Sequence, residues 1–163
     1  MGIVERHKIL AFYGVPGTGS TVTYHRMKKF TQFSESKNPI EYSRQYVDEP
    51  FQQTDVVGFA PSYAYAFDRH TGLDVQNDII DITDNEKLGD EAVRSIIIVD
   101  TTAATGTTSL TADAKMRSYS VIPNTEGDNI NIYTYSGNLK ARGELSEVTV
   151  STADDWQTVT INT

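Results

Sequence analysis

Most of this sequence alternates apolar or β-branched residues with polar ones in short runs, and this period of two constrains its fold more than any other feature. The clearest run, SYAYAFD, places Tyr63, Tyr65 and Phe67 on one face of a strand. Glycine, proline and asparagine separate the runs, as is typical of turns between strands. The pattern predicts a mainly β chain, with further strands within residues 23–33, 41–47, 94–102, 115–124, 129–145, 146–152 and 156–161.

One segment departs from this pattern and predicts a helix. In DVQNDIIDITDNEKL, residues 74–88, apolar side chains recur at helical spacing. Asp74 is a candidate N-cap, and Gly89 is a candidate terminator after the last turn. We expect an amphipathic helix laid on a sheet, with Asp78, Asp81 and Asp84 facing solvent and a core face made by Val75, Ile79, Ile80 and Ile82.

The length of 163 residues fits a single domain, and the net charge bears on which classes of ligand the chain can bind. A formal net charge of −8 argues against nucleic acid as a bound ligand, because such binding depends on cations that replace the counterions of the polyanion. Residues 1–47 carry seven basic and three acidic side chains, so the remainder holds the whole negative excess. This asymmetry either lets opposite ends of identical subunits attract one another or reflects an ordinary solvated surface.

The stretch GVPGTGST, residues 14–21, has the outline of a phosphate-binding loop but lacks its essential groups. Ser20 stands where such a loop needs lysine, and the residues that follow are typical of a strand rather than a helix. A turn between two strands explains Pro16 and the glycines better.

The sequence contains no motif that indicates a catalytic site or a cofactor site. It contains no cysteine, and His7, His25 and His70 lack the spacing of metal ligands. Neighbouring carboxylates are frequent, but nothing indicates the cleft or the raised pKa that a catalytic pair needs. We therefore expect a protein that is not an enzyme and that uses no cofactor and no metal.

The length of the apolar runs and the edges of the predicted sheet bear on location and self-association. No apolar run approaches the roughly 20 residues that cross a bilayer, and charged residues 5–8 interrupt any leader-like stretch. We expect no membrane partner and folding in a cytoplasm. Open sheet edges are commonly covered by a second copy of the chain, so the residues by themselves point to a self-associating β domain.

Several stretches of the chain carry a resemblance to a known family. The most specific are KNPIEYSRQYVDEPFQQTDV, residues 37–56, and DDWQTVT, residues 154–160. GDEAVRSIIIVD, SYSVIPNTEGD and YTYSGNLKARGE extend the likeness, which covers most of the chain from Tyr24 to Ile161. In these stretches the sequence resembles the major tail tube proteins of tailed phages, siphophage-like and with Gram-positive hosts.

The resemblance implies a fold and a structural role. The fold is mainly β: a β-sandwich or small barrel with one flanking α-helix and long loops between strands. Residues 1–163 would form one tail tube domain, with an N-terminal arm or hairpin over residues 1–23 and a variable tip over residues 101–113. Hexameric rings of the chain would stack into a hollow conduit for DNA during genome ejection. The implied partners are sister copies, the tape-measure protein, the tail terminator and distal tail proteins, in a virion tail assembled in the host cytoplasm.

Residues 47–61, VDEPFQQTDVVGFAP, are by this resemblance the candidate loop that reaches the next ring. Phe51 is expected to insert into a partner's surface, while Asp48, Glu49 and Asp55 meet the basic residues that precede position 47. An ordinary surface loop is the alternative. The expected lumen is acidic, because carboxylates repel the DNA phosphates and keep transit fast. Ejection kinetics of variants with neutralised inner-wall carboxylates would test that expectation.

Two other functions stay open at the level of the sequence. The same fold would serve as the inner tube of a contractile tail or bacteriocin, which a neighbouring sheath gene would indicate. A monomeric β-sandwich module for carbohydrate or cell-surface binding would instead use YAYAF, residues 63–67, and Trp156 as an exposed aromatic platform. In a tube subunit, Trp156 is expected to fill core or intersubunit space.

Overall fold

A computed structural model describes residues 2–162 and contains eleven strands and one α-helix. The strands are β1 Ile9–Pro16, β2 Val22–Arg26, β3 Phe30–Ser36, β4 Pro39–Arg44, β5 Gln53–Phe59, β6 Ser62–Asp68, β7 Val93–Asp100, β8 Leu110–Glu126, β9 Thr134–Ala141, β10 Ser146–Thr152 and β11 Thr158–Asn162. The helix α1 spans Asp74–Asp84, and three short 3₁₀ turns lie at Arg6–Lys8, Gly89–Ala92 and Thr101–Ala103.

Six of the strands close into a barrel, and the long strand β8 makes the closure possible. The order β10-β11-β2-β1-β7-β8 returns on itself because the first half of β8 pairs with β10. The second half of β8 pairs with β9, which continues the sheet through β6 to β3 outside the barrel. The expectation of a mainly β fold, a small barrel with one flanking helix, is confirmed.

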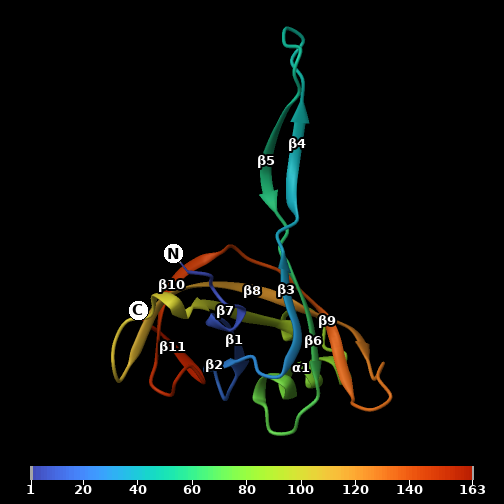
Figure 1. Ribbon diagram of the computed structural model, residues 1–163. Coiled ribbons are helices and arrows are strands. Elements are labelled where there is room, and N and C mark those ends of the chain that lie inside the picture. The colour runs from blue at the N-terminus through green and yellow to red at the C-terminus, as the bar shows by residue number, and fades with distance from the viewer. Residues whose placement is uncertain (1, 163) are drawn as a thin grey trace.

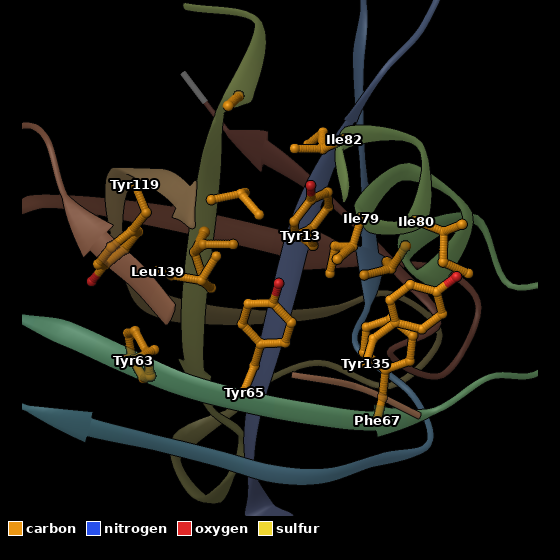
Figure 2. Packing of buried hydrophobic residues seen from close by; sticks show 14 residues of the cluster. Tyr13, Tyr63, Tyr65, Phe67, Ile79, Ile80, Ile82, Tyr119, Tyr135 and Leu139 are labelled. Carbon is orange, nitrogen blue, oxygen red and sulfur yellow. The ribbon is translucent and has the colours of Figure 1, made fainter. Parts of the chain in front are cut away.

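Two apolar clusters hold this arrangement together. The first fills the barrel and includes Phe12, Ile97 and Val150, all fully buried. The second lies outside the barrel wall, where α1 and the aromatic face of β6 pack against β1 and β7 (Figure 2). Tyr63, Tyr65 and Phe67 alternate with half-buried residues along β6, as the sequence pattern predicts.

The helix buries the residues of its expected core face, but it is shorter than expected. Val75, Ile79, Ile80 and Ile82 are each at most 8% exposed. Asp74 is the first helical residue, and the N-cap is Leu73, which makes no side-chain cap. The helix ends at Asp84 rather than before Gly89, because Glu86 takes a left-handed conformation with φ of 50° that stops the helical path.

The expectation that all three helix aspartates face solvent is wrong for Asp78. At about 100° per residue, Asp78 lies only about 40° from Ile82 and therefore on the edge of the core face. Its side chain is 12% exposed and binds Arg94 Nε at 2.8 Å. Asp81 is half-buried beside Lys87, and only Asp84 is fully exposed.

Two further stretches show where local sequence decides the chain path. Residues 23–33 do not form one strand, because Lys29 has a φ of 63° and the chain turns from β2 into β3. The GVPGTGST stretch is the turn of the β1–β2 hairpin, in which Gly17 N donates to Thr21 O at 2.7 Å. A strand, not a helix, follows it, so this stretch lacks the helix N-terminus of a phosphate-binding loop.

The loop before β11 is organised by Asp154. Its carboxylate accepts hydrogen bonds from Gln157 N, Thr158 N and the hydroxyls of Thr152 and Thr158. These bonds, those from Thr158 first, lower the pKa of Asp154 to about 2. The hydrogen bonds therefore stabilise the charged form and the loop together.

Stability is expected to depend on pH through this carboxyl. Because its folded pKa is below the unfolded value of about 3.9, its contribution is full above that value and is lost as the pH falls towards 2. Asp154→Asn is expected to destabilise the protein near neutral pH and to weaken the loss of stability between about pH 4 and pH 2. Urea denaturation across that range would measure this. Asp155→Asn, which removes a neighbouring carboxylate without these hydrogen bonds, should leave the profile close to wild type.

Among residues 2–162, no helix has the length and apolar character needed to cross a membrane.

Candidate assembly surface

A two-stranded ribbon made of β4 and β5 projects far from the barrel (Figure 1). It continues the paths of β3 and β6, and its base is fixed by Asn38, whose φ of 46° turns the chain between β3 and β4. The Asn38 amide donates to Ala60 O at 3.0 Å and to Ser62 Oγ at 3.3 Å. These contacts lock the two strands together where they leave the sheet. We call residues 37–60 the hairpin.

Polar contacts within the hairpin give it a defined shape. Arg44 Nη1 pairs with Asp55 at 2.6 Å across the two strands. Its guanidinium carbon lies 5.4 Å from the ring centre of Tyr42 and 5.7 Å from that of Tyr46. At the tip, residues 45–52, Glu49 N donates to Tyr46 O at 3.1 Å. The chain therefore presents an ordered projection rather than an irregular loop.

The hairpin exposes many apolar side chains to solvent. Val47 and Phe51 at the tip are 108% and 77% exposed, and apolar side chains along both strands are also open to solvent. A two-stranded hairpin is marginally stable in water by itself, and clustered exposed apolar residues mark interaction surfaces. The further exposed residues are Ile40, Tyr42, Tyr46, Val56, Val57 and Phe59. These features make the hairpin the candidate assembly surface.

The expected long loop over residues 47–61 is mostly strand. Residues 53–59 form β5, which pairs with β4 in antiparallel register, because TDVVGF supplies the β-branched and aromatic residues that suit a strand. Asp48, Glu49 and Phe51 all lie at the tip, whereas Asp55 lies in β5 and is occupied by Arg44 of the same chain. Contact of these four residues with another copy stays a prediction.

A groove that the sequence did not indicate lies beside the base of the hairpin. It has a volume of about 760 Å³ and follows one face of β7, β8 and β10, with Glu35, Lys37 and Tyr63 at its hairpin side. Burial, followed by the charge of Glu35, raises the pKa of Tyr63, and burial raises that of Tyr119. Both phenols are therefore protonated at neutral pH. We call this hollow the β8 groove.

The aromatic residues of the alternative binding module are not available for a ligand platform. Tyr63, Tyr65 and Phe67 are buried in the cluster that also contains the core face of α1, and Trp156 is 7% exposed inside the barrel. Stacking on a sugar needs an open aromatic face, so these residues cannot serve as the expected platform. They form core instead.

Comparisons with known proteins give a likeness in structure but not in sequence. No known protein family matches the sequence, and no curated protein matches it. Among solved structures, the fold is similar to a chain of the "Cryo-EM structure of the anti-feeding prophage (AFP) baseplate, 6-fold symmetrised". The TM-score is 0.47 at 6% sequence identity, over 91% of this chain and 97% of that chain.

Proposed function

We propose that the protein is a structural subunit of a phage tail tube, whose rings stack into a conduit for DNA. The observation that carries this proposal is the hairpin, an ordered ribbon whose tip side chains Val47 and Phe51 stay exposed among residues 2–162. The resemblance of the hairpin sequence to tail tube proteins supports the same reading. The closed barrel supplies a rigid body from which the ribbon projects.

Assembly follows from the shape of the subunit. A projection on one side of a rigid body, bound by a site elsewhere on the next copy, generates a repeating contact that continues in one direction. Copies within a ring would associate laterally, and the hairpin would join one ring to the next. Burial of the hairpin's apolar side chains would supply the driving force for stacking.

The proposed lumen is acidic, and its function is passage rather than binding. The chain carries 22 acidic and 14 basic side chains, so a ring of several copies has a large negative excess. A conduit that grips duplex DNA through many cations would retain it, because each neutralised phosphate adds to the affinity. An excess of carboxylates on the inner wall would instead keep the DNA moving.

Removing the apolar tip is expected to stop stacking without unfolding the subunit. Val47→Ser with Phe51→Ser takes away two exposed side chains, so the melting temperature should stay within a few degrees of wild type. Negative-stain electron microscopy of concentrated wild-type protein should show rings or tubes with a central channel. The double variant should show no tubes, whereas Leu88→Ser, an exposed apolar residue after α1, should assemble as wild type does.

The proposal would be wrong if the wild-type chain remained a monomer at every concentration. Sedimentation velocity would detect this independently of microscopy. A specific carbohydrate ligand bound by such a monomer would support a binding module instead.

A further inference from the structure

Arg117 lines the β8 groove and is half-buried, with the Tyr119 phenol beside its guanidinium. Its Nε and Nη1 atoms are shielded from solvent and make no hydrogen bond. No carboxylate of residues 2–162 lies within 4.0 Å of its guanidinium. Four acids share the groove, and each has another partner. Glu35 pairs with Lys37 at 3.0 Å, Glu147 with Lys115 at 4.0 Å, Asp113 accepts from Thr149 at 3.4 Å, and Asp100 accepts from Thr102 N at 3.0 Å.

Shielding these two nitrogens of Arg117 without acceptors costs free energy, and the β8 groove beside them has room for a segment of another chain. Nitrogen–hydrogen groups removed from water need acceptors, and a carboxylate satisfies two of them at once. Apolar side chains from β7, from the loop before β10 and from β10 line the same groove: Ile98, Leu145 and Val148. The groove therefore fits a segment that carries a carboxylate between apolar side chains.

The tip of the hairpin has this chemistry. Asp48 accepts no hydrogen bond and joins no ion pair within the described chain, in contrast to Glu49, which accepts from Gln53 Nε2 at 2.8 Å. The apolar residues Val47 and Phe51 flank Asp48, and both are highly exposed. An unpaired carboxylate beside exposed apolar side chains thus matches a guanidinium with two free nitrogens beside apolar side chains.

The geometry excludes docking within one chain and favours docking between successive copies. Lys37 lies both at the base of the hairpin and on the wall of the groove. Asp48 follows Lys37 by eleven positions, and the chain between them runs along β4 and into the tip, which places Asp48 at most about 35 Å from its own groove. Figure 1 shows the ribbon pointing away from the barrel. A second copy shifted along the ribbon by this length would bring its groove to the tip of the first.

We propose that the hairpin tip of one copy docks in the β8 groove of the next copy, with Asp48 on Arg117. This inference rests on the proposed tube function and names the acceptor of the hairpin. Because donor and acceptor surfaces differ, the contact is head-to-tail and does not close after two copies. The axial repeat of the stack should then be no longer than the reach of the hairpin, at most about 35 Å.

Arg117→Met and Asp48→Asn test the pairing, because they remove either charge while keeping most of the side-chain volume. Each is expected to raise the protein concentration needed for tube formation at least about tenfold, as loss of a central charged contact does. Arg117→Met should also leave the melting temperature of the unassembled subunit unchanged or higher, since it removes two shielded nitrogens that lack acceptors. A merely structural arginine would instead lower it. Lys140→Glu, an exposed change on β9, serves as the control and should assemble normally.

A reversal of the two charges supplies the decisive result. Asp48→Arg and Arg117→Glu are each expected to abolish tubes, and the chain that carries both should recover them to within about threefold of the wild-type concentration. Wild-type tubes together with normal assembly of Arg117→Met would overturn this pairing and leave the tube proposal intact. Failure of the double variant to exceed either single variant would do the same. Absence of tubes from the wild type would overturn both.

Discussion

Replacing Asp78 with alanine is expected to lower the free energy of unfolding by about 3–5 kcal/mol. Asp78 and Arg94 are 12% and 9% exposed, and the carboxylate accepts from Arg94 Nε at 2.8 Å and from the Tyr13 hydroxyl. Without the carboxylate, Arg94 is left as an uncompensated charge between α1 and the barrel. Burial, followed by the charge of Asp78, also raises the pKa of Tyr13, so the phenol remains a donor that loses its acceptor.

Urea denaturation of Asp78→Ala would measure this loss, with Asp84→Ala as the matched control on the same helix. Asp84 is exposed and makes no ion pair in the described chain, so its removal should change stability by no more than about 0.5 kcal/mol. The double variant Asp78→Leu/Arg94→Met should recover much of the loss, because paired apolar replacements remove both buried charges. A loss below about 1 kcal/mol for Asp78→Ala would show that the network does not hold α1 in place.

Trp156→Ala is expected to cost about 3–5 kcal/mol, because it leaves a large cavity at one end of the barrel. Trp156 is 7% exposed and lies near Phe12, with ring centroids 6.4 Å apart. It packs in the same cluster as the fully buried Val150. The barrel closes through β10 and β11, so the loss should appear as a lower melting temperature of the whole domain.

Trp156→Gly separates the cavity from the backbone conformation at this position. Trp156 has a φ of 62°, a left-handed conformation that glycine adopts without cost and alanine does not. The glycine variant should therefore be slightly more stable than the alanine variant, although both remain far below wild type. Trp156→Phe, which keeps most of the apolar volume, should lose less than either. Equal stability of wild type and Trp156→Ala in thermal unfolding would contradict the core role.

The sequence predicted the parts of the fold that depend on local periodicity. The alternation of Tyr63, Tyr65 and Phe67 predicted both β6 and its buried face, because strand geometry requires alternate side chains to share a side. The helical spacing of residues 75–82 predicted α1 for the corresponding reason. The helix ends were less predictable, since Glu86 stops the helix through a conformation that its residue type does not favour.

The sequence singled out the segment of the candidate assembly surface, but it did not predict that this segment forms a strand. The sequence singled out residues 47–61, yet β5 within them pairs with β4 rather than forming a loop, and Asp55 binds Arg44 of its own chain. The sequence did not indicate the β8 groove, because its walls come from strands far apart in the sequence, from β1 to β11. Arg117 in an alternating run looks like any exposed strand residue until its neighbours across the sheet are known.

By itself, the sequence determined the mainly β class, the single helix and the buried faces of the most regular elements, because these follow from side-chain periods of 2 and 3.6 residues along the chain. Only the tertiary structure decided the closure of the barrel through β8 and β10, the pairing of Asp78 with Arg94 and the isolation of Arg117. Each of these depends on residues that meet across long separations in the chain. The periodicity of one segment carries no information about which distant segment will lie beside it.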